Sequence, residues 1–525
     1  MASLSARTLI CNVASLFSGV WGEVTHQAHK ADCSRQAIYQ QKDRVVQAVE
    51  EAQAGGPSRA KLLEENTQLR QENEVLWQFV ATLVDFPVAT QQKFATAATA
   101  MGLSLNQLVV LLTIVLGQAG CPSRAKLGRW VQDAGKRAGL LLRVLDRCCT
   151  TMVLTLCLDE IFLRQQPILM GVEPQSMTWV LGQRAKDRTG KTWAEALAPW
   201  KQMTYAVVDG GVGLRHGLDL TAQQRRQAES KVALESNLDN FHIQKDGQKA
   251  LRAEWREAEL VWEKAERADR IAFEKGQRQG QDARAEKTAA REAWKRAEKA
   301  FVRADQREAA FQRALAALEI FRADGSLNDR ESARAELEAA LKELPAERWA
   351  KFHRMALNED ALTFLDRMHR QLQEAEPRAE LREALVKLWQ ARHPWWRKKF
   401  GGNLQRDPLQ VALRTLVCQK TEAKWEESYL RISAVLRDTV RASSVVECMN
   451  SVLRMHQARH RGLSQGLIDL KRLYWNCRSF AEGKRKGHCP YEHLGLLLPS
   501  YDWWELLQMS PEELAQKVSS AKVAV

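Results

Sequence analysis

The sequence lacks both the spacings of a zinc site and an apolar run long enough to cross a membrane. Its ten cysteines are scattered apart from the adjacent pair Cys148–Cys149, and no CxxC occurs. This excludes the common zinc motifs and favours reduced thiols. The longest apolar run, LVVLLTIVL at 108–116, is far shorter than the ~20 residues that a bilayer requires. We therefore expect no membrane partner and a cytoplasmic, nucleoid-associated location.

Proline is absent between Pro199 and Pro345, and alanine, glutamate, arginine and lysine dominate residues 246–435. Such a composition favours long helices with solvated faces. Apolar residues recur through this block and indicate helices that pack on one another: Trp255, Trp262, Ile271, Phe273, Trp294, Phe301 and Phe311.

What the chain has in excess is positive charge. Its 525 residues carry a net charge of +14, with 45% apolar and 27% charged residues. The length suggests three or four domains at ~150 residues each. Because a polyanion is the natural partner of a basic protein, nucleic acid is the first expectation.

Residues 1–52 are predicted to form a helix-turn-helix DNA-binding domain. Within 23–48 we predict a helix, a short turn at 30–33, and a second helix capped by Ser34. Polar and basic side chains near the start of a recognition helix contact base edges and phosphates. The predicted contact face is Arg35, Gln36, Tyr39 and Gln40. An ordinary helical hairpin is the alternative.

Residues 53–88 contain leucines spaced seven apart, at Leu62, Leu69, Leu76 and Leu83. This is the spacing of a two-stranded coiled-coil seam. The helix either dimerises the chain or packs on its neighbour, and the spacing leaves both open.

Residues 89–149 are predicted to form a second helical DNA-binding bundle. The phrase QAGGPSRAKL at 53–62 returns as QAGCPSRAKL at 118–127, with nine identities in ten. In both copies Pro and Ser stand where a helix begins. The basic residues in the first turns of these helices either contact the DNA backbone or belong to a recurrent way of starting a helix that has no function of its own.

After residue 150, runs rich in β-branched and aromatic residues predict a mixed α/β sheet. The predicted strands are 151–163, 167–172, 176–183, 204–210 and 234–243, and a helix at 191–200 lies between the third and fourth.

Two of these strands carry aspartates, and a later helix offers a third acid. Asp159 lies within the first strand and Asp209 ends the fourth. On a predicted helix at 443–457, Glu447 shares a face with Asn450 and Arg454. Converging carboxylates need a cation, and all-oxygen ligands fit two Mg²⁺ (or Mn²⁺) ions. Singly, each acid is as well explained as a structural or solvated residue.

The order of LCLDE, AVVDGG, LDNFH and VVECMN resembles the DDE transposases of bacterial insertion sequences, in the retroviral-integrase superfamily. The resemblance covers roughly 150–245 and 436–495. It implies an α/β RNase H-like catalytic core, with parts at 150–245 and 436–480. A large all-α insertion at 246–435 would divide the core, helical DNA-binding regions would precede it, and a basic tail at 481–525 would follow.

The resemblance also implies residue roles. The metal-binding catalytic triad would be Asp159, Asp209 and Glu447, whereas Glu160 should point to the other face of its strand. Asn450 and Arg454 would touch the scissile phosphate or the neighbouring backbone. Asp239 and His242 would position substrate or support the site, although a packed histidine on a strand is the alternative.

Positive charge surrounds the third acid. Residues 441–488 contain ten Lys or Arg against three Asp or Glu. A metal triad that cuts DNA needs a phosphate cradle, and this one would include Arg459, Arg461, Lys471 and Arg472.

The expected function is therefore a transposase that forms a homodimer or higher oligomer. It would bind the terminal inverted repeats of its element, hydrolyse phosphodiester bonds and join the 3′-hydroxyls to double-stranded target DNA. Two alternatives stay open: an RNase H-like structure-specific nuclease, and a non-catalytic DNA-binding scaffold.

Overall fold

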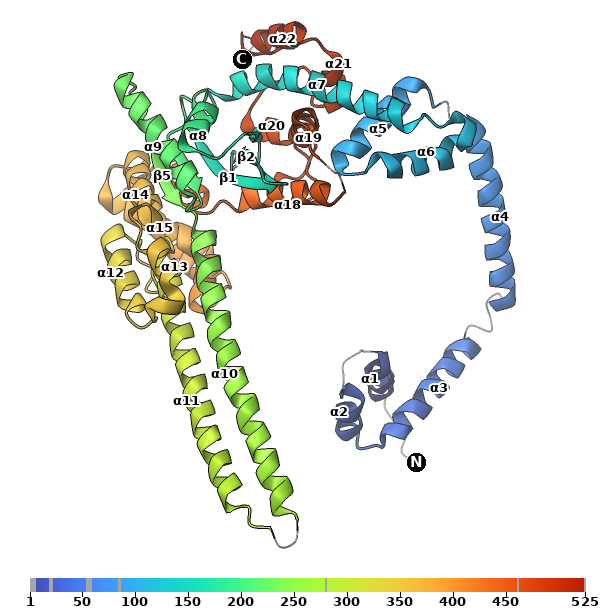
Figure 1. The fold of residues 1–525 in the computed structure, drawn as a ribbon, viewed down its shortest axis with the longest axis vertical. Helices are drawn as coiled ribbons and strands as arrows, with labels where there is room; N and C mark the ends of the chain where they lie inside the picture. The colour runs from blue at the N-terminus through green and yellow to red at the C-terminus, as the bar shows by residue number, and fades with distance from the viewer. Residues whose placement is uncertain are drawn as a thin grey trace. The chain divides into compact units, whose positions relative to one another are not determined.

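The computed structural model describes residues 6–17, 22–52, 59–83, 86–278, 281–459 and 462–523. The chain divides into two compact units, Met1–Pro87 and Val88–Val525 (Figure 1). Among the described residues, no helix is both long and apolar enough to traverse a bilayer.

The first unit contains α1 (Ala6–Phe17), α2 (Glu23–Lys30), α3 (Arg35–Ala52) and α4 (Arg59–Leu83). The buried Asn12 amide joins the first three helices: it donates to Gln41 on α3 (2.7 Å) and accepts from Gln27 on α2 (2.8 Å). The predicted turn between α2 and α3 is present, and the Ser34 hydroxyl accepts from the backbone N–H of Ala37 at 3.1 Å.

The second unit opens with α5 (Val88–Met101), α6 (Leu105–Gly120) and α7 (Arg124–Cys149). Helices α4 and α7 both begin directly after the repeated Pro-Ser, as the repeat predicts. However, α7 packs its apolar side against one face of the sheet. Residues 89–149 therefore belong to the same compact unit as the sheet, and α7 is part of the sheet's cover.

The five predicted strands are β1 (Thr155–Leu163), β2 (Gln166–Val172), β3 (Trp179–Arg184), β4 (Tyr205–Val208) and β5 (Glu235–Leu238). They form one sheet in the order β3-β2-β1-β4-β5. The pairs β1–β2 and β2–β3 are antiparallel, whereas β1–β4 and β4–β5 are parallel. The predicted helix between β3 and β4 is α8 (Gly190–Leu197), and α9 (Val212–Gln227) connects β4 to β5.

Both faces of the sheet are buried, which explains why β1 and β4 are almost continuously apolar. Leu156 and Leu158 of β1 face α7, α8 and α19. Cys157 and Ile161 face the helices of the insertion, among them α11 and α13. The insertion is thus half of the sheet's hydrophobic cover.

The insertion starts with a long antiparallel hairpin, α10 (Asn240–Gly276) and α11 (Arg284–Ala317) (Figure 1). Alanines such as Ala265 and Ala297 are buried between the two helices, and Trp262 packs on Trp294 with ring centres 4.7 Å apart. The predicted packing of helix on helix is confirmed. The described residues of the block also form α12 (Arg330–Leu341), α13 (Ala346–Ala356), α14 (Thr363–Ala375), α15 (Ala379–Arg392), α16 (Pro408–Thr421) and α17 (Trp425–Asp438), with short 3-10 helices at Glu359–Leu362 and Pro394–Phe400.

The C-terminal part returns to the sheet. Helix α18 (Ser444–Arg459) lies beside β1 (Figure 1), and α19 (Gln465–Cys477) packs on α7 so closely that a Cβ at Gly135 would lie 2.6 Å from the Gly466 carbonyl oxygen. The expected basic tail instead contains short helices with buried apolar residues: α20 (Pro490–Leu494), α21 (Trp503–Gln508) and α22 (Pro511–Val523).

Candidate active site

Parallel pairing brings the two predicted aspartates to the same level of the sheet. Asp159 and Asp209 directly follow two residues, Leu158 and Val208, that pair with each other in the β1–β4 register. The same holds for Asp209 and Asp239 across β4 and β5. Three aspartates from three adjacent strands therefore meet at one edge, where α/β sheets bind their ligands.

Helix α18 is fastened over this edge at two points. The Asn450 amide donates to Asp159 Oδ2 at 2.6 Å. The Ser443 backbone N–H donates to Asp239 Oδ1 at 3.1 Å, and its hydroxyl donates to Asp239 Oδ2. Glu447 lies between these two attachments on the same side of the helix, so the structure brings it to the two aspartates.

The carboxylates affect one another. The pKa of Asp159 is raised to about 6, chiefly by burial and then by the negative charge of Asp209, with a smaller contribution from Glu447. The Glu160 backbone N–H and His242 oppose the rise. An acid cluster of this kind is stabilised by a cation.

His242 differs from its predicted setting. The expected fifth strand ends at Leu238 because Asp239 caps α10, with its side chain accepting from the Phe241 N–H at 2.8 Å. His242 is therefore in the first turn of a helix, and the alternative of a histidine packed on a strand is wrong. Its Nδ1 lies 2.6 Å from Asp239 Oδ2 and its Nε2 lies 3.7 Å from Glu447 Oε1.

Asp239 and His242 each favour the charged form of the other. Burial alone would lower the pKa of His242, but the hydrogen bond to Asp239 and the nearby carboxylates raise it overall. Burial would raise the pKa of Asp239, but the hydrogen bonds from His242 and Ser443 lower it overall. A protonated His242 then places positive charge beside Glu447.

Two more cations face Glu447. Lys245 Nζ lies 3.9 Å from Oε1, and a guanidinium nitrogen of Arg454 lies 3.6 Å from Oε2. Both cations are well exposed, with 45% and 58% of their side-chain surface accessible. They can therefore contact a solvent-borne phosphate. The sequence did not single out Lys245, although it follows His242 by about one helical turn on α10.

The donor set suits a hard divalent cation, although the side chains do not surround one as they stand. Among the described residues, no three His, Cys, Asp or Glu side chains form a metal-binding group. Asn450 Oδ1, however, is buried without a hydrogen-bond partner beside Asp159. Three carboxylates and a free amide oxygen are the ligand chemistry of Mg²⁺ or Mn²⁺, and Glu447 has to turn from its cationic neighbours to take part.

The neighbouring acid Glu160 points away, as expected. Its carboxylate is bound by Arg188 at 2.7 Å and by the Trp193 indole N–H at 3.3 Å on the other face of β1. Glu160 is thus an acid adjacent in sequence to Asp159 but outside the cluster.

Two members of the expected phosphate cradle are buried, so that part of the prediction is wrong. Lys471 donates to the Ala100 carbonyl at 2.9 Å, and burial lowers its pKa to about 7. Arg472 pairs with Asp146 at 2.6 Å and donates to the Val180 carbonyl. Both side chains hold α19 against α5, α7 and β3, and neither can reach DNA.

The remaining predicted contacts divide by location. In the first unit, Arg35, Gln36 and Tyr39 are all exposed at the start of α3. Arg461 lies outside the described residues, as does the side chain of Arg459.

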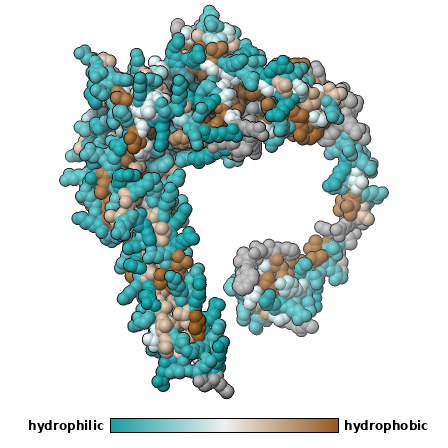
Figure 2. All heavy atoms as spheres, viewed as in Figure 1, coloured by the Kyte–Doolittle hydropathy of each residue, from teal (hydrophilic) through white to brown (hydrophobic). Residues whose placement is uncertain are grey.

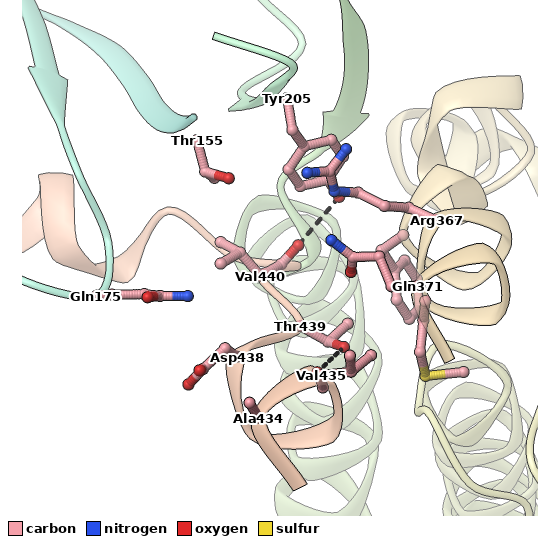
Figure 3. A pocket seen from close by; sticks show the side chains of 12 residues that line it. Thr155, Gln175, Tyr205, Arg367, Gln371, Ala434, Val435, Asp438, Thr439 and Val440 are labelled. Atoms are coloured by element: carbon pink, nitrogen blue, oxygen red, sulfur yellow. Dashed lines mark hydrogen bonds between the residues drawn. The ribbon is translucent and has the colours of Figure 1, made fainter. Parts of the chain in front are cut away.

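A cavity of about 210 Å³ lies near the amino ends of β1 and β4, away from the acids (Figure 3). The Arg367 guanidinium of α14 lies 4.7 Å from the Tyr205 ring centre. The Tyr205 hydroxyl donates to the Val440 carbonyl at 3.0 Å. These contacts attach α14 of the insertion, and the segment just before α18, to the sheet, which gives the cavity a structural explanation.

The raised pKa of Asp159 yields a stability prediction. In the unfolded chain the pKa is close to 3.8, and in the folded chain it is about 6. Between these pH values the folded protein binds more protons, so stability falls as the pH rises through this window. The difference amounts to roughly 3 kcal/mol. In EDTA, Asp159→Asn should raise the thermal midpoint by several degrees at pH 8 and change it little at pH 4. An equal shift at both pH values would contradict this cause.

No family model, curated protein or solved structure matches this chain.

Proposed function

We propose that the protein is a DDE-type transposase that cuts DNA at the ends of its element and joins them to target DNA. One observation carries the proposal: Asp159 and Asp209 lie side by side at one sheet edge, and Asn450 attaches α18, the helix that carries Glu447, to Asp159. Exposed cations line the same cluster. The sheet, in which parallel β4 and β5 extend an antiparallel meander, is compatible with an RNase H-like core.

In this proposal the three acids would hold two Mg²⁺ or Mn²⁺ ions, and the chemistry that such ions would supply is activation of the attacking oxygen and stabilisation of the leaving oxygen of a phosphodiester. Asn450 keeps Asp159 in place through its amide N–H. Asp239 fixes both the start of α18 and the ring of His242. Lys245 and Arg454 bind the DNA phosphates next to the reacting one.

The nucleophile is first water and then the 3′-hydroxyl of the cut strand. In the first step the water oxygen forms a bond to phosphorus and the 3′-oxygen leaves. In the second, the freed 3′-oxygen attacks a target phosphorus and displaces that strand's 3′-oxygen. Neither step requires a covalent protein intermediate.

Joining is the step that tests the proposal. The full chain is incubated with labelled DNA carrying the inverted repeats that flank its gene, a plasmid target and Mg²⁺. We expect cleavage at the repeat ends and labelled plasmid, both lost in EDTA. Cleavage without joining would favour the structure-specific nuclease, and DNA binding without cleavage would favour the scaffold.

A further inference from the structure

Helix α4 presents an uncovered apolar stripe. All of its described side chains, residues 60–74, are exposed. Leu62 and Leu69 keep 52% and 61% of their surface accessible. Figure 2 shows hydrophobic atoms at the surface of this helix. An isolated helix of 25 residues is only marginally stable in water, so the stripe calls for a partner.

The stripe repeats every seven residues, and this spacing indicates what kind of partner would cover it. Leu62, Leu69, Leu76 and Leu83 all occupy heptad position d, and α4 extends through all four. A strict seven-residue repeat drifts around a straight helix and stays in contact only with a second helix that supercoils with it. The partner is therefore a helix with the same repeat.

Position a is asparagine in the two central heptads, whereas the first heptad has Arg59 and the last has Val80 there. Asn66 and Asn73 each stand three residues before a leucine of the stripe. Asparagine at position a is tolerated in parallel two-stranded coiled coils, where the two amides meet across the seam and fix the register. Two such positions in succession favour an identical helix in register over an apolar surface of another kind.

The flanking charges are complementary to a second copy. Glu65 occupies position g and Arg70 the following position e, and these positions face each other across a parallel seam. Within the described part of the chain, neither side chain forms an ion pair with its own molecule. In a symmetric dimer the pair would form twice.

We propose that α4 pairs with α4 of a second copy of this chain as a parallel, in-register, two-stranded coiled coil. The seam consists of the four leucines at d and of Arg59, Asn66, Asn73 and Val80 at a, and Glu65 of each copy faces Arg70 of the other. This dimerisation does not depend on the catalytic proposal.

Sedimentation of the full chain tests the pairing. The wild type should sediment with the mass of two chains, and Leu69→Lys with that of one, because a charge at d is buried in the seam. Gln71→Lys adds the same charge on the outer face of α4 and should stay dimeric. Both positions are exposed, so neither substitution should disturb a packed core. Leu69→Lys should lose only the part of the circular-dichroism signal that α4 contributes, because an unpaired α4 is marginally stable, and Gln71→Lys should keep the full signal. A monomeric wild type, or a dimeric Leu69→Lys variant, would overturn the proposal.

Charge exchange tests the parallel register. Glu65→Lys and Arg70→Glu each place like charges together at both flanks, and each should raise the dimer dissociation constant on the order of tenfold. The double variant restores opposite charges and should recover wild-type affinity. Failure of the double variant to recover would exclude the parallel, in-register arrangement.

Discussion

Replacing Asp209 by asparagine is expected to abolish DNA cleavage and joining, by at least ~1000-fold in rate, which corresponds to about 4 kcal/mol of lost transition-state stabilisation. The amide keeps the side-chain shape and can still accept the Gly211 N–H that now binds Asp209 Oδ1 at 2.9 Å. What it loses is the negative charge that would hold a divalent cation. The measurement is single-turnover cleavage of labelled ends.

Glu160→Gln is the matched control for this loss. It also removes one carboxylate from the same region of the sheet, but that carboxylate binds Arg188 and Trp193 on the opposite face. The control should cleave within about threefold of the wild type, as expected for a group outside the reaction. A folded, DNA-bound Asp209→Asn variant that cleaved as fast as Glu160→Gln would exclude the metal triad.

The second large effect is expected at Asp239. Its buried carboxylate accepts hydrogen bonds from Phe241, His242 and Ser443. Asp239→Ala removes the helix cap, leaves several donors unpaired and frees the start of α18. We expect a loss of about 3–5 kcal/mol in the free energy of unfolding, and cleavage should fall because Glu447 is no longer positioned. Thermal unfolding and hydrogen exchange along α18 measure the two consequences.

Asp407→Ala is the control that distinguishes the loss of a helix cap from the release of α18. Asp407 caps α16 by accepting the Leu409 N–H at 3.0 Å, but it is exposed. Its loss should cost about 1 kcal/mol, the usual contribution of a cap, with normal exchange along α18. Equal losses for the two variants would mean that Asp239 is an ordinary cap.

The strands were accessible from sequence because their signals are local, whereas the grouping of the three acids was expected only from the resemblance in the order of the motifs. Buried strands such as β1 and β4 are continuous apolar runs, and a period of 3.6 residues puts Glu447 and Asn450 on one face of a helix. The end of β5 was misjudged because LESNLDNFHI continues in apolar character past Asp239. The capping aspartate was the available signal for a helix start there.

The predictions for Lys471 and Arg472 were wrong because the count of charges took no account of where the side chains point. Lys471 and Arg472 lie between Leu470 and Leu473, which are both buried on α19. That apolar setting was the warning that the two cations point inward. The packing of the insertion on the sheet left no comparable signal, because small residues such as Ala310 and Ala314 form much of the contact. Only the three-dimensional structure shows which surface they meet.

The bond between Asn450 and Asp159 joins residues 291 positions apart. At roughly 5–20 residues per second of synthesis, Asp159 emerges on the order of 15 to 60 s before its partner. Until then the growing chain has the first two acids without the third. Under the proposed function, a nascent or prematurely terminated polypeptide that stops before α18 would therefore be unable to cut DNA.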